Sequence, residues 1–209
     1  MSKQKKILLV VTGGVAAYKS IELVRLLVAE NYFVTPVMTD SATHFVTPLS
    51  LSVLSGQKVQ KTLWDIDSEI RFGHIELSRQ ADLIVVAPAT ANFIAKVANG
   101  LADDLATSII LATNKPVLMV PAMNVRMWEH EATKRNIRQL KNDGVNFLEP
   151  KKGIMACGEF GYGRMAEPVE IFADIETRLN SAITTKLRGK RVLVTSGPTE
   201  EPIDPVRYI

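Results

Sequence analysis

Reactive and polar side chains lie beside glycines at several points of this 209-residue chain, and one such segment holds its only cysteine. Cys157 lies in IMACGEFGYGRMAEP, residues 154–168, rather than in an apolar run. Four glycines are close to it in the sequence, at Gly153, Gly158, Gly161 and Gly163. A cysteine thiol is reactive only in particular surroundings. Taken alone, Cys157 is equally a redox sensor or a residue without a chemical role.

Of the three histidines, His74 is the candidate for chemistry. His44 and His130 lie within helical patterns beside charged or aromatic residues, which is typical of surface or packing positions. His74, in RFGHIELSRQADL, follows a glycine in a segment that leads into a predicted strand. An imidazole titrates near neutral pH and can act as a general base, although a lone histidine is often structural. No second histidine or acid lies at metal-ligand spacing, so we expect no metal site.

The segment TGGVAAYK, residues 12–19, joins a predicted strand to a predicted helix. Glycines at such a turn let backbone amides approach an anion at the positive end of the helix, so a phosphate could bind there. The spacing is not G-x-G-x-x-G, and the next strand is followed by Thr39-Asp40-Ser41 rather than by a lone acid. These features favour a mononucleotide over a dinucleotide. A tight glycine turn without a ligand remains the alternative.

Two further segments place polar residues after predicted strands. APATANF, residues 87–93, lies at the carboxyl edge of a strand, where open α/β sheets bind ligands, but a helix cap at Thr90 explains it equally well. PAMNVRMW, residues 121–128, places the Asn124 amide where it could hydrogen-bond a substrate, with core packing as the alternative.

The elements that position these segments alternate between strands and helices. Mostly apolar runs of strand length lie at residues 7–11, 33–38, 83–87, 117–120, 145–148 and 191–195. Such runs are typical of parallel strands covered on both faces, and Pro36 favours an edge for the second run. Helical patterns lie at residues 20–30, 47–56, 89–100, 102–113, 126–144 and 169–183. The chain is therefore predicted to form an α/β, doubly wound, mostly parallel sheet, with residues 149–167 as a long loop or flap.

Composition excludes several other classes of protein. Hydrophobic residues make up 46% and charged residues 22% of the chain, and its net charge is +3. This is a globular composition with no basic stripe, so we expect no nucleic-acid partner. The five apolar residues 7–11 are too few for a signal peptide or a membrane span. Together with a single cysteine, this predicts a cytoplasmic protein without disulfides.

The motifs TGGVAAYK, GHIEL, APATANF, PAMNVRMW and ACGEFGYGRMAEP, in this order, resemble those of phosphopantothenoylcysteine decarboxylases, a group of flavin-containing cysteine decarboxylases. The resemblance covers about residues 5–182 and implies a Rossmann-like flavoprotein domain at residues 1–183 with a glycine-rich substrate flap. Residues 184–190 read as a linker. Residues 191–209 resemble the opening of phosphopantothenate–cysteine ligase, and we expect this part to be truncated and inactive.

The resemblance also implies a cofactor, a substrate and roles for particular residues. The cofactor is FMN, and the substrate is 4′-phosphopantothenoylcysteine. FMN would be bound by Gly13, Gly14, Val15, Thr39, Ala42, Ala89, Thr90, Ala91, Asn92 and Ala122. The catalytic residues would be His74 as base, Asn124 as the group that orients the substrate, and Cys157 as proton donor. The substrate would also be contacted by Met127, Arg164 and Met165.

Members of this group assemble as trimers that build dodecamers, so the resemblance implies a homo-oligomer with FMN between subunits. Two other functions stay open. A peptidyl-cysteine decarboxylase of the lantibiotic type would stop at the enethiol and would not need the Cys157 thiol. A flavin-binding subunit without catalysis would not need His74, Asn124 and Cys157 together. A NAD-binding domain is disfavoured, because the dinucleotide fingerprint is missing.

Overall fold

The computed structural model describes residues 4–63 and 73–181, and the site considered below lies in the first of two compact units, Met1–Leu179. Five strands form a parallel sheet in the order β2-β1-β3-β4-β5. They are β1 (Lys6–Val11), β2 (Phe33–Met38), β3 (Leu83–Ala89), β4 (Val117–Pro121) and β5 (Asn146–Phe147). The parallel α/β sheet predicted from the sequence is confirmed.

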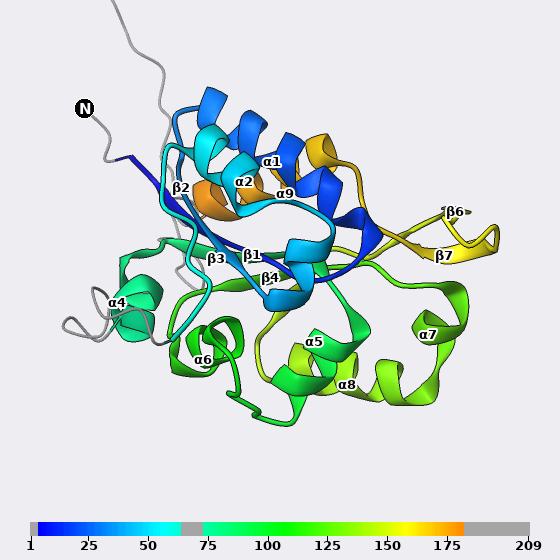
Figure 1. The fold of residues 1–209 in the computed structure, drawn as a ribbon. Helices are drawn as coiled ribbons and strands as arrows, with labels where there is room; N and C mark the ends of the chain where they lie inside the picture. Colours follow the sequence, from blue (N-terminus) through cyan, green and yellow to red (C-terminus); the bar gives the residue numbers. More distant parts are fainter. Residues whose placement is uncertain (1–3, 64–72, 182–209) are drawn as a thin grey trace, which may run out of the picture. The chain divides into compact units, whose positions relative to one another are not determined.

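Helices cover both faces of the sheet (Figure 1). On one face lie α1 (Tyr18–Ala29), α2 (Pro48–Ser55) and α9 (Pro168–Ser181). On the other lie α4 (Gly73–Gln80), α5 (Ala91–Ala98), α6 (Leu105–Ala112) and α8 (Glu131–Asn142). Short 3₁₀ turns, η1 (Val15–Ala17) and η2 (Asp40–His44), follow β1 and β2. None of the helices in the described residues is long and apolar enough to cross a membrane.

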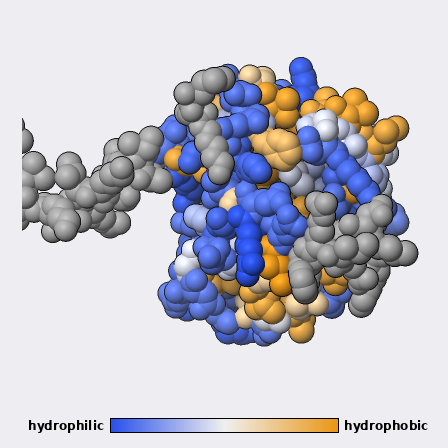
Figure 2. Space-filling model, turned by 90° about the vertical axis from the view of Figure 1, so that its left-hand side faces the viewer, coloured by the Kyte–Doolittle hydropathy of each residue, from blue (hydrophilic) through white to orange (hydrophobic). Residues whose placement is uncertain are grey.

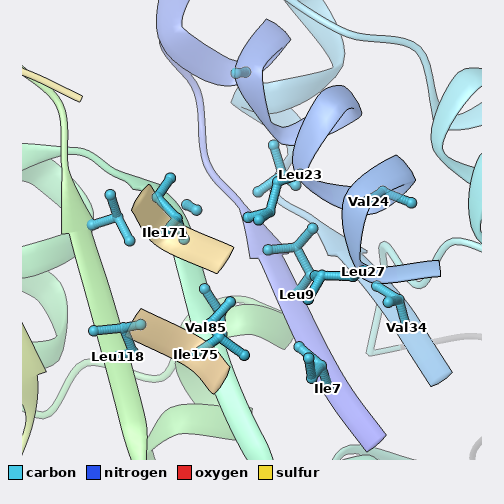
Figure 3. Packing of buried hydrophobic residues seen from close by; sticks show 14 of the residues in the cluster. Ile7, Leu9, Leu23, Val24, Leu27, Val34, Val85, Leu118, Ile171 and Ile175 are labelled. Atoms are coloured by element: carbon cyan, nitrogen blue, oxygen red, sulfur yellow. The ribbon is translucent and has the colours of Figure 1, made fainter. Parts of the chain in front are cut away.

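The strands are apolar on both faces because each face is covered by helices. In β1, Ile7, Leu9 and Val11 belong to the core under α1 and α9, whereas Leu8 and Val10 belong to the core on the opposite face. Figure 3 shows the first of these cores, in which the labelled residues Leu23 and Leu27 of α1 lie over the sheet beside Ile171 and Ile175 of α9. Each such side chain contributes about 1.5–3 kcal/mol when fully buried. The sheet is therefore a firm support for the loops at its ends.

Local signals in the sequence are confirmed at the edge strand and at α2. Pro36 lies in β2, which is the outermost strand next to β1. The Thr47 side chain caps α2 by accepting a hydrogen bond from Ser50 N at 3.1 Å, and Gly56 ends the helix in the left-handed conformation. Both features depend on residues close together in the chain, which is why the sequence predicts them.

The single helix predicted over residues 126–144 is wrong, because the structure divides it into α7 (Val125–Glu129) and α8. The break lies at His130, whose backbone is extended (φ −64°, ψ 134°) and whose ring Nδ1 accepts a hydrogen bond from Ala132 N at 3.1 Å. A side chain that bonds the backbone in this way caps a new helix instead of continuing the old one. His130 is thus structural, and His44 lies exposed at the end of η2, as expected for both.

The loop predicted over residues 149–167 is also wrong in part, because this segment forms an antiparallel hairpin of β6 (Lys151–Ile154) and β7 (Phe160–Arg164). The hairpin projects from the molecule beside α7 (Figure 1). The glycines of these strands interrupt the alternation of side chains by which a strand is recognised in a sequence. Gly163 has φ +138° and lies against the Met123 backbone, where a side chain would not fit. Met123 N donates to Gly163 O at 3.0 Å, which joins the hairpin to the loop after β4.

Some of the predicted segments lie outside the residues that the structure describes. The strand predicted at 191–195, the linker at 184–190 and the ligase-like segment at 191–209 lie outside the described residues. The helix predicted over 169–183 would bury one apolar stripe, of which Ile171, Ile175 and Leu179 are buried in α9, and Ile183 lies beyond the described part.

Exposed large hydrophobic residues are spread over several elements of the described chain. Figure 2 shows one side of the molecule, on which hydrophobic residues gather in separate groups among hydrophilic ones. Surface apolar residues dispersed in this way are ordinary.

Candidate active site

The strand order changes direction between β1 and β3, and the loops that follow these two strands lie side by side there. The hydroxyl of Thr12, after β1, donates to Pro88 O at 2.7 Å and accepts from Thr90 N at 3.3 Å. Thr90 in turn caps α5 by accepting from Phe93 N at 3.3 Å. In open α/β sheets, ligands bind at this point of reversal. The cap at Thr90 and a ligand site at the same residue are therefore compatible.

Close packing explains the first glycine of the loop after β1. A Cβ atom at Gly13 would lie 2.4 Å from Ser41 Cβ and 2.9 Å from the Ser41 backbone, so no larger residue fits without a shift. The helix that follows is fixed to the sheet by Ser20, whose hydroxyl donates to Ala87 O at 2.7 Å. The loops after β1 and β2 are thus held in contact.

The start of α1 differs from the starts of five other helices. Side-chain caps begin α2, α5, α6, α7 and α8, at Thr47, Thr90, Asp104, Asn124 and His130. Neither η1 nor α1 has such a cap within the described residues, so no side chain there accepts from their first N–H groups. The turn η1 leads directly into α1, and Ala17 N donates to Gly14 O at 2.9 Å and Tyr18 N to Ala16 O. The N–H groups that suit an anion such as a phosphate are therefore those at the start of η1, from Val15 onward.

Thr39, after β2, carries a buried hydroxyl that has no hydrogen-bond partner in the described part of the chain. Leaving a buried polar group unpaired costs about 1–3 kcal/mol. Thr39 lies at the wall of the cavity described next, so a ligand there could supply the missing partner.

One cavity of about 840 Å³ brings most of the predicted site residues together. Its sheet wall, as we call it, consists of the loops after β1, β2, β3 and β4, at residues 12–16, 39–41, 90–93 and 122–124. The predicted residues that line the cavity are Gly13, Gly14, Val15, Thr39, Thr90, Ala91, Asn92, Ala122, Asn124, Met127, Cys157, Arg164 and Met165.

Two predicted site residues do not line this cavity, and the side chain of a third is outside the described part of the chain. Ala42 and Ala89 are fully buried in the core behind the sheet wall. His74 is the second residue of α4, and its side chain lies outside the part of the chain that the structure describes. Met165, although at the wall, is only 1% exposed and belongs mainly to the core.

The Asn124 side chain caps a helix with its amide oxygen and leaves its amide nitrogen for a ligand. Its Oδ1 accepts a hydrogen bond from Met127 N at 2.8 Å and caps α7. Because a backbone N–H can only donate, the atom that faces it must be the amide oxygen. The Nδ2 amine donates no hydrogen bond within the described residues, so it is the part of Asn124 that a ligand in the cavity can use.

The opposite wall of the cavity comes from the β6–β7 hairpin. Met155 to Gly158 form its turn, closed by a hydrogen bond from Gly158 N to Met155 O at 2.9 Å, and Gly158 has φ +82°. Cys157 lies in this turn and is exposed, with its Sγ 3.8 Å from Glu159 Oε2. The hairpin therefore presents a free thiol to the cavity that the sheet wall lines.

Several charged residues at the cavity are absent from the residues predicted from the sequence. Lys19, Lys61 and Lys96 line it, together with Asp40, Asp103 and Asp104. A hydrogen bond from Lys96 lowers the pKa of Asp103 and, in return, raises the pKa of Lys96. For Lys19 the sequence did hold a signal, because Lys19, Leu23 and Leu27 recur every four residues on the buried face of α1.

Comparison with known proteins identifies the family. A family model described as Flavoprotein matches residues 1–180. The chain belongs to this flavoprotein family. A flavin is thus the cofactor that the family implies for the cavity. A second model, described as DNA/pantothenate metabolism flavoprotein C-terminal domain, matches residues 187–209.

Individual relatives confirm the resemblance inferred from the motifs. The chain is 47% identical, over 98% of its length, to the coenzyme A biosynthesis bifunctional protein CoaBC of Haemophilus influenzae, and 45% identical, over 100%, to that of Bacillus subtilis. It covers 51% of each, so it spans about half the length of these relatives. A solved structure of a PPC decarboxylase mutant complexed with pantothenoylaminoethenethiol is similar with a TM-score of 0.75 and 37% identity, covering 86% of this chain and 100% of that one.

Proposed function

We propose that this flavoprotein catalyses the FMN-dependent decarboxylation of 4′-phosphopantothenoylcysteine to 4′-phosphopantetheine, a step of coenzyme A biosynthesis. The observation that carries the proposal is that the glycine loop after β1, Asn124 and Cys157 line one cavity. Similarity to a PPC decarboxylase over that protein's whole length supports the same reaction. The names of the bifunctional relatives support the same pathway.

The sheet wall fits FMN in three ways. The turn η1, which leads into α1 and has no side-chain cap, offers the N–H groups of its first residues to the phosphate, beside Gly14 and Val15. The buried Thr39 hydroxyl has no hydrogen-bond partner among the described residues, and the flavin would supply one. The Ala91–Asn92 segment, which lines the cavity after Thr90, completes the wall. When bound, FMN supplies a two-electron sink that accepts a hydride from the cysteine portion of the substrate and returns it later.

Asn124 would bind and orient the substrate. Its Nδ2 amine can donate to the carboxylate that is to be lost, while its Oδ1 is held by the Met127 backbone. Fixing the side chain in this way before the substrate arrives lowers the entropic cost of positioning the reacting carbon. Met127, which is 44% exposed at the same cavity, would contact the apolar part of the substrate.

Proton transfer would involve His74 and Cys157. His74 would act as the base when the substrate is oxidised and its carboxylate leaves as carbon dioxide. The product of that half-reaction is an enethiol, whose reduction needs one hydride and one proton. Cys157 would donate the proton from the exposed turn of the hairpin. Since the electrons return to the product, the reaction needs no external electron acceptor.

The proposal also includes the assembly of the protein, its ligase segment and its location in the cell. The chain would form homotrimers or dodecamers with FMN between subunits, residues 191–209 would begin a ligase domain, and the protein would act in the cytoplasm. Light scattering of the purified flavin-loaded protein would measure its assembly, and a monomer would contradict the expected oligomer.

The proposal is tested with purified protein and substrate labelled at the cysteine carboxylate. We expect an oxidised-flavin absorption spectrum and release of labelled carbon dioxide. His74→Asn should keep the flavin but lose roughly 100-fold or more in rate, since general-base catalysis contributes about 10²–10⁴-fold. A colourless wild-type protein, or one that binds flavin without releasing carbon dioxide, would contradict the proposal. A peptide ending in cysteine, offered in parallel, tests the lantibiotic-type alternative.

A further inference from the structure

Lys19 is a buried cation at the junction between the glycine loop and the hairpin. It is the second residue of α1 and only 5% exposed. Lysine is rarely buried unless its ammonium is paired. Its Nζ donates to Met165 O at 2.9 Å and to Glu167 Oε1 at 3.0 Å, both just after β7. Lys19 therefore ties the start of α1 to the base of the hairpin, two parts of the chain that adjoin in Figure 1.

Glu167 is shared between two cations. The Oε1 that accepts from Lys19 also accepts from Arg164 Nη2 at 2.5 Å. The hydrogen bond from Lys19 is the main cause that holds the pKa of Glu167 below its ordinary value, so this carboxylate stays ionised at neutral pH. Because Lys19 is buried and fixed by two acceptors, the carboxylate that it holds is a stable anchor for Arg164.

Arg164 lies at the cavity with its side chain across the hairpin. A Cβ atom built on Gly153 of β6 would lie 3.4 Å from Arg164 Cδ and 3.5 Å from its Nη1, so the arginine passes over a strand position that has no side chain. The arginine side chain is 48% exposed and would otherwise sample many rotamers. Nη2 is held by Glu167, and within the described residues no other N–H group of the guanidinium donates a hydrogen bond, so these groups can bind an anion.

We propose that Glu167, held by Lys19, is a positioning residue that aims the Arg164 guanidinium at an anionic group of the substrate. The inference rests on the proposed function and adds two residues to that site. The anion is either the carboxylate or the phosphate of the substrate, since a guanidinium binds both. Glu167 itself does not touch the substrate and acts only through Arg164.

A double-mutant cycle tests this role. Glu167→Gln should raise KM about tenfold, as expected when a charged hydrogen bond that orients a binding group is lost, and change kcat less than about twofold. Arg164→Ala should raise KM at least as much. In the Arg164→Ala background, Glu167→Gln should have no further effect on KM. The flavin spectrum and flavin content should be unchanged in each variant.

The matched control is Glu170→Gln. Glu170, in the first turn of α9, forms an ion pair with Lys151 of the other hairpin strand at 2.6 Å and does not line the cavity. It also accepts from Glu167 N at 3.0 Å, a hydrogen bond that the amide oxygen of glutamine can still accept. Its replacement removes the same charge at the same hairpin base, and KM should stay within about twofold of wild type, as for an exposed pair. Substrate without its phosphate separates the two anions. If Arg164 binds the phosphate, the KM effects disappear with this substrate, and if it binds the carboxylate, they persist.

The outcomes are distinct. An unchanged KM in Glu167→Gln, or KM effects of the two substitutions that multiply in the double variant, would overturn the positioning role. A KM effect of Glu170→Gln equal to that of Glu167→Gln would do the same. Wild-type protein that binds flavin and releases no carbon dioxide would overturn the proposed function, and this inference with it.

Discussion

The sheet wall and the β6–β7 hairpin line the same cavity but are held in place differently. Behind the sheet wall, Ala42 and Ala89 are fully buried, and the Thr12 hydroxyl joins the loop after β1 to Pro88 O of β3 and to Thr90 N of the loop after β3. On the hairpin, Ile154 and Phe160 are 72% and 65% exposed. A wall supported by the core suits a cofactor that stays through many turnovers, whereas an exposed hairpin suits a substrate that must enter and leave. Substitutions in each wall test whether the sheet wall binds the cofactor and the hairpin serves the substrate.

The largest effect is expected on the hairpin, at Cys157. Cys157→Ser should still release carbon dioxide but accumulate an oxidised enethiol, with the rate of 4′-phosphopantetheine formation lowered roughly 100-fold, since a proton donor contributes about 10²–10⁴-fold. Mass spectrometry of the products measures both species, and flavin content should equal that of wild type. Formation of 4′-phosphopantetheine at the normal rate would show that Cys157 is not the donor.

The next largest effect is expected from the close packing of Gly13 against Ser41 in the sheet wall. Gly13→Ala places a Cβ against the backbone of Ser41 and should destabilise the protein by about 1–3 kcal/mol, as overpacking does, with loss of flavin. Gly14→Ala is the matched control, because its Cβ would lie 3.6 Å from Thr90 Cγ2, an ordinary contact. Thermal unfolding of the flavin-free proteins measures the difference. Equal melting temperatures for the two variants would contradict the close packing at Gly13.

At Thr39 we expect smaller effects, which differ in direction between the stability of the flavin-free protein and its affinity for flavin. Thr39→Val removes a buried hydroxyl that has no partner in the described residues, so the flavin-free protein should be as stable as wild type or more stable. Flavin affinity should fall about fivefold, the cost of one hydrogen bond. Flavin titration and thermal unfolding measure the two quantities separately. Loss of stability without loss of affinity would place the role of this hydroxyl in the fold rather than at the ligand.

The smallest effect is a pH dependence at the base of the hairpin. Because the pKa of Glu167 is lowered on folding, its ion pairs stabilise the protein above the unfolded value of about 4.5, and this contribution is lost as the pH falls through the lower folded pKa. The melting temperature of wild type should exceed that of Glu167→Gln slightly at neutral pH, and the two should converge in acid. A difference that persists below the folded pKa would exclude the ionised carboxylate as its source.

The two walls also differ in how far the sequence predicts them. The strands, the edge position of Pro36 and the Thr47–Gly56 helix follow from patterns within a few residues. The hairpin does not, because its glycines have no side-chain period and its strands are paired through the backbone. Lys19 shows the same limit, since the carboxylate that pairs with it is 148 residues away in the chain. Its burial was predictable from the helical period, but its partner was not.

The break at His130 and the hydroxyl of Thr39 illustrate a further limit. A histidine in a helical pattern does not reveal that its ring will accept from Ala132 N and begin a new helix. Likewise, that a threonine hydroxyl is buried without a partner depends on atoms from several loops and is visible only in three dimensions. The sequence thus predicts which loops form the site, and the structure adds which of their groups remain available in the described residues.

The proposed division, in which the sheet wall holds the flavin and the hairpin supplies a proton to the enethiol, is tested most directly by anaerobic turnover. The purified flavin-loaded protein is incubated with 4′-phosphopantothenoylcysteine without any electron acceptor. We predict many turnovers per flavin, with carbon dioxide and 4′-phosphopantetheine formed in equal amounts and the flavin oxidised at the end. A single turnover that leaves an enethiol and a reduced flavin would contradict the account.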